Sequence, residues 1–150
     1  MPRLSAPVTF TVHHEFDAPA DRLWRELVDW EGHAAWIPMT TMDVPEGDPT
    51  AIGYEFTAST GVGPLQLRDH MRVVRCEWDG ERGECEVDKL GPVLTGRAAF
   101  TVEPLGADRS AIVWLEDVEV PWVPSFLGPL VARFGALGFR QGMKGLAKRL

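Results

Sequence analysis

Residues 8–24 read VTFTVHHEFDAPADRLW and place a strand, a turn and the start of a helix in succession. At the beginning of this stretch alternate positions are apolar, with one histidine among them: Val8, Phe10, Val12, His14 and Phe16. A period of two is typical of a strand that buries one face. Pro19 then stands where a helix tolerates proline, because the N–H groups of the first turn have no helical partner. The stretch predicts a half-buried strand that leads directly into a short helix.

The short helix is predicted from an apolar stripe with helical spacing, formed by Leu23, Trp24, Leu27 and Val28. Residues 29–38 follow with two more tryptophans, Trp30 and Trp36, and predict a second short helix or a turn. Two prolines and a glycine within residues 45–49 mark a loop. We therefore expect two short helical elements, packed by tryptophans, after the first strand.

Five further strands are predicted at short spacing, over residues 52–58, 65–78, 83–90, 94–104 and 110–120. Glycine, proline and aspartate residues separate them, in the stretches 61–64, 79–80, 91–92 and 106–108. Consecutive strands joined by such short connections form hairpins. The pattern predicts an antiparallel meander.

Residues 124–150 predict one long helix, in which Pro129 falls within the first turns. Four glycines lie along one side of it, at Gly135, Gly138, Gly142 and Gly145. Each glycine costs a helix interior about 1 kcal/mol relative to alanine, so tertiary contacts must offset several kcal/mol. Either the helix backbone approaches another element closely there, or the glycines leave space for something else.

Composition narrows the function. A length of 150 residues predicts one domain, 1–150, and a net charge of −7 argues against a general nucleic-acid binder. Residues 120–150 nevertheless carry five basic and no acidic side chains, which suits either a solvated helix face or transient contact with a membrane surface. No apolar stretch is long enough for stable membrane insertion, and none resembles a signal peptide, so a cytoplasmic location is expected.

The two cysteines are expected to be reduced in the cytoplasm. Cys76 and Cys85 lie symmetrically about the turn at residues 80–81. A tight hairpin would place them opposite each other, near enough to cross-link under oxidation.

Several of these features together resemble one superfamily. Residues 16–24, FDAPADRLW, resemble the I-D-A-P-x-x-x-V-W opening of START-like, or SRPBCC, proteins. Asp29 followed by Trp36 resembles the D…W pair after the first helix of that group, and Ile52-Gly53-Tyr54 resembles its V-G-x strand start. The likeness extends over the whole chain and is greatest to the polyketide cyclase/dehydrase and lipid-transport-like branch, which is bacterial.

The resemblance implies an α+β helix-grip fold: a curved antiparallel sheet of about six or seven strands wrapped around a long C-terminal helix, enclosing an apolar cavity. It implies the binding or transport of a hydrophobic small molecule, lipid-like or polyketide-like. Two alternatives stay open, a polyketide cyclase, aromatase or dehydratase, and a protein-interaction module without a ligand, because a fold does not choose among functions.

Three polar residues lie on otherwise apolar strand faces and are the candidates for catalysis: His14, Asp69 and Glu116. An imidazole near carboxylates suits general acid–base chemistry at neutral pH, which a cyclase would need. For Asp69 the assignment depends on register, because a one-residue slip or a bulge would turn Arg68, His70 or Arg72 inward instead. His33 and His70 are predicted to lie on the surface. No metal site and no cofactor are expected.

The predicted ligand-binding residues are those on the inward strand faces and on the first half of the last helix. They are Val12, His14, Tyr54, Phe56, Leu67, Asp69, Met71, Phe100, Trp114, Glu116, Phe126, Leu130 and Phe134. Phe139, Met143 and Leu146 either form an external patch or pack beneath the first helices, so a monomer and a homodimer both remain open.

Overall fold

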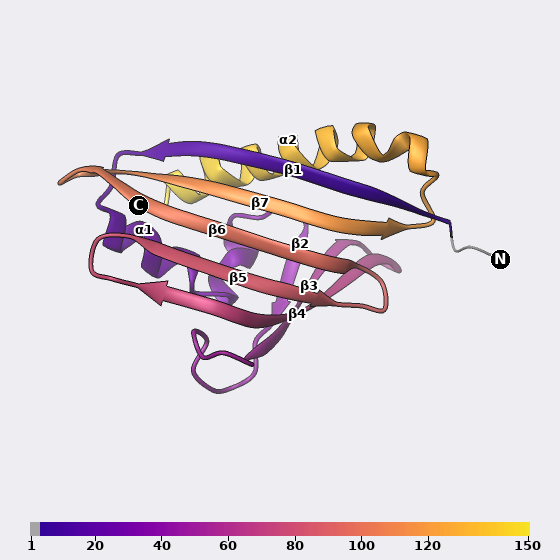
Figure 1. Ribbon diagram of the computed structural model, residues 1–150, viewed down its shortest axis with the longest axis horizontal. Coiled ribbons are helices and arrows are strands. Elements are labelled where there is room, and N and C mark those ends of the chain that lie inside the picture. The colour runs from indigo at the N-terminus through magenta and orange to yellow at the C-terminus, as the bar shows by residue number, and fades with distance from the viewer. Residues whose placement is uncertain (1–3) are drawn as a thin grey trace.

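The computed structural model describes residues 4–150, so residues 1–3 of the predicted domain lie outside the described part. Its elements are, in order, β1 (Ser5–Phe16), α1 (Ala20–Leu27), the 3-10 turn η1 (Glu31–Ala35), β2 (Thr40–Asp43), β3 (Glu55–Val62), β4 (Leu65–Trp78), β5 (Gly83–Leu90), β6 (Thr95–Gly106), β7 (Arg109–Pro121), the 3-10 turn η2 (Ser125–Leu127) and α2 (Gly128–Ala147). Figure 1 shows one curved sheet with α2 lying across it. The predicted α+β helix-grip fold is confirmed.

All seven strands form one antiparallel sheet in the order β1-β7-β6-β5-β4-β3-β2. The strands from β3 to β7 are the predicted meander, and β4 and β5 have the predicted ends. Residues 52–54 precede β3 instead of opening it, because β3 begins at Glu55. The edge strand β2 was not predicted, since its four residues, TTMD, are too few to show an alternating pattern.

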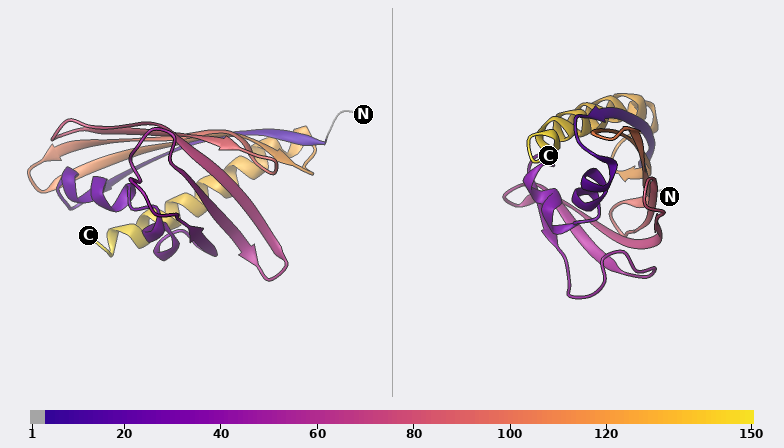
Figure 2. Two further views of the ribbon diagram at one scale, coloured as in Figure 1. Left: turned by 90° about the horizontal axis from the view of Figure 1, so that it is seen from below. Right: turned by 90° about the vertical axis from the view of Figure 1, so that its left-hand side faces the viewer.

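The sheet curls around one side of the molecule, and the β3–β4 hairpin projects away from the other strands (Figure 2). A register shift in β4 between Val73 and Arg75 contributes to this bend, as β-bulges do. Because the bulge lies beyond Asp69, the register before it is regular, and Leu67, Asp69 and Met71 face inward as predicted.

The two cysteines face each other across neighbouring strands, as predicted. Cys76 of β4 is paired with Cys85 of β5 in the strand register, and both are free thiols. Cys85 is buried while Cys76 is half-buried.

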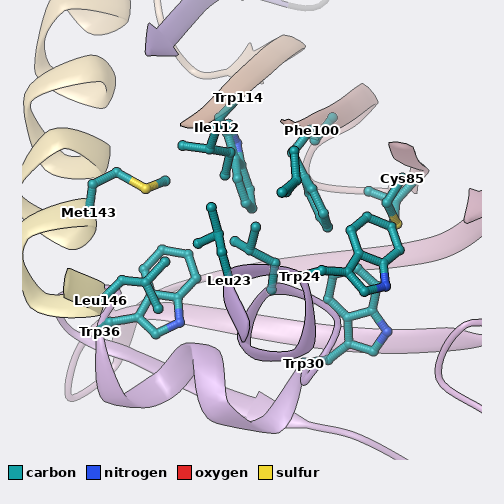
Figure 3. Close-up of a cluster of buried hydrophobic side chains, with 14 of the residues drawn as sticks. Leu23, Trp24, Trp30, Trp36, Cys85, Phe100, Ile112, Trp114, Met143 and Leu146 are labelled. Atoms are coloured by element: carbon teal, nitrogen blue, oxygen red, sulfur yellow. The ribbon is translucent and has the colours of Figure 1, made fainter. Parts of the chain in front are cut away.

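A core of large side chains fills one end of the fold, between the sheet, α1, η1 and the last turns of α2 (Figure 3). Leu23 and Leu27 of α1 are completely buried there, as are Met143 and Leu146 of α2. The position of these two α2 residues shows that they pack beneath the first helices and do not form an external patch. The tryptophans predicted to pack the short helical elements, Trp24, Trp30 and Trp36, are likewise buried.

Helix α2 begins at Gly128, later than the predicted residue 124, because η2 occupies the preceding residues; Pro129 lies in its first turn. Both of its ends touch backbone. At Gly128 an added Cβ would lie 2.6 Å from the carbonyl oxygen of Pro7, and at Gly142 it would lie 3.2 Å from that of Trp36. Between these ends, a Cβ on Gly138 would meet no atom within 4 Å. Gly135 is also closely packed, since a Cβ there would lie 2.6 Å from the ring of Phe10. The glycines of α2 therefore serve close packing at most positions and leave open space at Gly138.

We expect replacement by alanine to have opposite effects at two glycines of α2. Gly138→Ala should raise the free energy of unfolding by about 1 kcal/mol, because it adds helix propensity without a clash. Gly128→Ala should lower it by about 1–3 kcal/mol, because the new methyl group displaces the backbone of β1. Chemical denaturation of both variants beside the parent protein measures the difference. Equal effects would contradict the end-anchored arrangement of α2.

Candidate functional site

A cavity of about 420 Å³ lies between the concave face of the sheet, the middle of α2 and the segment from η1 to β2. Its lining is mainly apolar, and six aromatic side chains contribute to it, from β1, the α1–η1 connection, β3, β6, β7 and α2: Phe10, Trp30, Phe56, Phe100, Trp114 and Phe139. Volumes of about 300–1,000 Å³ are usual for small-molecule sites. The cavity is thus of a size and composition suited to an apolar ligand.

The aromatic lining is held rigid by ring contacts. Phe100 and Trp114 stack with centroids 5.3 Å apart, and Trp114 also packs against Phe139 at 5.1 Å. Trp30 stacks on Phe56 at 4.5 Å and meets Phe100 edge-on at 6.3 Å. Such pairs add to the energy of burial and fix the orientation of each ring. These contacts preform the walls of the cavity.

The exposed residues of the lining mark where the cavity meets solvent. Most of the lining residues are buried or half-buried, but four of them are exposed: Pro38, Met39, Thr60 and Gly138. These residues belong to the η1–β2 connection, β3 and the middle of α2, so the opening lies between the β2–β3 edge of the sheet and α2. The missing side chain of Gly138 widens this opening.

One group of charged side chains interrupts the apolar lining. Lys89 of β5 forms ion pairs with Asp69 of β4 and, at 3.5 Å, with Oε2 of Glu116 on β7. The indole Nε1–H of Trp114 donates a hydrogen bond of 3.0 Å to Oε1 of Glu116. The three charged side chains, which we call the charged cluster, are mostly buried: 5% of Lys89, 8% of Glu116 and 15% of Asp69 is exposed.

Burial and pairing have opposite effects on the pKa values in the charged cluster. Burial raises the pKa of the Glu116 carboxyl, and the nearby charge of Lys89 and the Trp114 hydrogen bond offset only part of the rise. For Lys89, burial favours the neutral amine, but the charges of Glu116 and Asp69 outweigh it and raise the pKa of the ammonium group. Lys89 is therefore a stable cation, whereas Glu116 accepts a proton more readily than an ordinary glutamate.

Sequence reasoning found Asp69 and Glu116 but missed Lys89. The signal was present in β5, where Gly83, Cys85, Val87 and Lys89 alternate with exposed or half-buried residues and share one buried face. Extending the period-two pattern to Lys89 would have placed it beside the two carboxylates. Among residues 4–150, no three histidine, cysteine or carboxylate side chains converge to hold a metal ion.

The structure places His14 outside the cavity. Its ring packs on that of Phe16, with centroids 4.7 Å apart, on the inward face of β1. Partial burial lowers the pKa of His14, and the charges of His13 and Lys144 lower it further. Because Lys144 belongs to the second half of α2, His14 lies near the packed end of the fold. It contacts Phe16 and forms no ion pair with Asp69 or Glu116.

The other predicted ligand-binding residues divide into two groups. Seven line the cavity: Phe56, Leu67, Asp69, Met71, Phe100, Trp114 and Glu116. Five do not line it: Val12, Tyr54, Phe126, Leu130 and Phe134. Val12 is enclosed in the core, and the Tyr54 hydroxyl donates to the carbonyl oxygen of Pro45.

The remaining three, on η2 and α2, point to solvent. Phe126 is 77% exposed and Phe134 66%, with Leu130 between them on the same helical face. The residues of α2 that line the cavity are Val131, Gly135, Gly138 and Phe139, which lie on an adjacent face. The sequence showed an apolar stripe but not which part of it faces the sheet.

His33 was predicted to lie on the surface, and this prediction is wrong. Only 4% of the residue is exposed, and its ring lies among Trp30, Trp36 and Trp114. Its Nε2–H donates a 2.7 Å hydrogen bond to the carbonyl oxygen of Leu27, which joins the end of α1 to η1. Burial lowers the pKa of His33 to about 4, although this hydrogen bond partly opposes the shift. Its neutral form is thus part of the cavity wall.

The low pKa of His33 predicts a pH-dependent stability. Above pH 6.5 the side chain is neutral in both the folded and unfolded states and has no effect. As the pH falls from 6.5 to about 4, the unfolded chain takes up a proton that the folded protein excludes, so the free energy of unfolding should drop by about 3 kcal/mol. Urea titrations between pH 7 and pH 4 measure this loss.

His33→Gln should reduce that pH-dependent loss, because glutamine does not titrate. The matched control is His13→Gln, since His13 is exposed on β1. A parent protein and a His33→Gln variant that lose stability in parallel would rule out His33 as the cause.

Comparisons with known proteins identify a matching family and a shared fold. The sequence model of the family described as "Polyketide cyclase / dehydrase and lipid transport" matches residues 7–150. A START superfamily protein from Mycobacterium smegmatis has a TM-score of 0.70 at 19% identity, over 94% of this chain and 95% of its own. A Thermobifida fusca protein has a TM-score of 0.69 at 20% identity, over 94% and 91%. At these identities the likeness shows the fold alone. No curated protein matches the sequence.

Proposed function

This chain belongs to the polyketide cyclase/dehydrase and lipid transport family, and we propose that it binds and carries a hydrophobic small molecule in the cavity beneath α2. The single observation that supports this most is the cavity itself, about 420 Å³ in volume and walled mainly by apolar and aromatic side chains. Trp114 and Phe100 hold each other in place by stacking, so neither side chain can turn to fill the space.

The direct test is native mass spectrometry of the purified protein, followed by organic extraction of anything bound to it. A reproducible mass increase from a compound that extracts into organic solvent would support the proposal and identify the ligand class. An unliganded mass, together with no thermal shift from a panel of lipids and aromatic polyketides, would contradict it.

A large side chain at the opening of the cavity should weaken binding without unfolding the protein. Gly138→Leu introduces a large apolar side chain where a Cβ meets no atom within 4 Å. We expect at least a tenfold loss of affinity for an apolar probe, dodecyl methyl ether, measured by the fluorescence of the cavity tryptophans. The thermal midpoint should stay equal or rise, because the substitution also removes a helical glycine.

The matched control is Gln141→Leu, which adds the same side chain to α2 at an exposed position. It should bind the probe as the parent protein does. Equal affinity in the parent protein, Gly138→Leu and Gln141→Leu would show that the probe binds elsewhere.

One observation favours a cyclase or dehydratase as the second candidate. Burial raises the pKa of Glu116 and so favours the protonated form that a general acid needs, and the residue lines the cavity. Such an enzyme would use Glu116 with Lys89 or Asp69, since His14 is not part of the lining. Turnover of a poly-ketone substrate that Glu116→Gln abolishes, while binding persists, would favour this reading. An interaction module without a ligand is disfavoured by a cavity that the protein's own side chains leave unfilled.

The exposed apolar side chains at the start of α2 are the surface where transient contact with a membrane or with a second copy would occur. Phe126, Leu130, Phe134 and Leu137 belong to this outer face, near the basic Arg133 and Arg140. In residues 4–150, no helix has both the length and the apolar character needed to cross a membrane. We propose a carrier that works in the cytoplasm and makes at most passing contact with a membrane.

A further inference from the structure

The charged cluster contains one acceptor more than its donors satisfy. Lys89 Nζ is bonded to Oδ2 of Asp69 and paired with Oε2 of Glu116, and its remaining recorded contact is Met71 Sδ at 3.7 Å. Both oxygens of Glu116 have partners, through Lys89 and Trp114. Asp69 Oδ1 is buried and has no partner in the described part of the chain. A buried carboxylate oxygen without a donor is costly, so a donor from outside the protein would be stabilised there.

Asp69 is also the most exposed member of the charged cluster. Its side chain is 15% exposed, compared with 5% for Lys89 and 8% for Glu116, and it lines the cavity together with Leu67 and Met71. The terminal torsion of an aspartate is soft, so the carboxylate can adjust to a donor in the cavity. A donor on a bound molecule would therefore meet the Asp69 carboxylate first.

The net charge of the charged cluster determines which ligand head groups can bind beside it. With both carboxylates ionised it carries a formal charge of −1, and with Glu116 protonated it carries 0. In neither state is it positive, and the single cation, Lys89, is already shared between two carboxylates. A ligand carboxylate would enter a low-dielectric cavity next to Asp69 without a free positive partner, which is strongly unfavourable. A neutral hydroxyl or an ammonium group would meet an acceptor instead.

From this geometry, and resting on the proposed function, we infer that the cavity selects apolar molecules whose polar end is a hydrogen-bond donor. Alcohols and amines are the ligand class, and Asp69 is the residue that receives the donor. Molecules of the same apolar body that end in a carboxylate are rejected. The aromatic walls and the charged cluster thus have separate roles, the first in affinity and the second in selection of the head group.

The test compares three probes with one alkyl chain: dodecanol, dodecyl methyl ether and dodecanoate. Binding to the whole protein at pH 7 is measured by tryptophan fluorescence and by calorimetry. We expect dodecanol to bind at least tenfold more tightly than the ether, which cannot donate, and more tightly still than dodecanoate. This comparison uses the unmodified protein and so does not depend on the folding of any variant.

Asp69→Asn then identifies the receiving group. Its amide oxygen can still accept from Lys89, which leaves the NH2 group as a donor toward the cavity. The preference for dodecanol over the ether should fall to threefold or less, and dodecanoate should bind better than it does to the parent protein. Asp88→Asn is the matched control, because Asp88 is the exposed neighbour of Lys89 on β5 and should leave all three affinities unchanged.

The outcomes separate the inference from the proposed function. Equal binding of the three probes, or preference for dodecanoate, would overturn the inference while supporting an apolar carrier. An unchanged dodecanol preference in Asp69→Asn would overturn the role of Asp69. Binding of none of the probes would count against both the inference and the proposed function.

Discussion

The attachment of α2 at its two ends is the constraint on which the rest of the structure depends. Gly128 lies against the backbone of β1, and Gly142 and Gly145 lie against Trp36. Because side chains are missing at these points, the helix is held at a fixed separation from a sheet that curves away beneath it. Between these ends Gly135 lies against the ring of Phe10, so the helix cannot move closer to β1. The cavity is the space that this geometry leaves, with Gly138 at its opening.

The charged cluster lies on the concave face of the same sheet. Strands β4, β5 and β7 each direct one ionisable side chain to the concave face, at Asp69, Lys89 and Glu116. A buried ion pair adds little to stability, because the loss of hydration offsets most of the attraction. The charged cluster places one polar point within mainly apolar walls. That point gives the cavity an orientation that a wholly apolar space would lack.

Much of the fold could be predicted because it follows from local pattern. The alternating patterns at residues 65–78 and 83–90 predicted β4 and β5 with the correct first and last residues. A long apolar segment without an internal helix breaker predicted α2. The short edge strand β2 could not be found in this way, because its four residues show no alternating pattern. They form a strand only because they pair with β3. His33 looked like a surface residue for a similar reason, because only the packing of three tryptophans around it decides its burial.

The sequence by itself determined which residues share a face, and hence the antiparallel sheet, the long helix and the inward direction of Glu116, whereas that of Asp69 depended on the register of β4. Strand periodicity is a property of the backbone and can be read from neighbouring residues. Only the tertiary structure decided which of those inward residues meet. His14 lies on the predicted face yet outside the cavity, whereas Lys89 completes the charged cluster from a strand in between. Distances between strands and the rotation of a helix about its axis depend on packing across the whole chain, so no local pattern contains them.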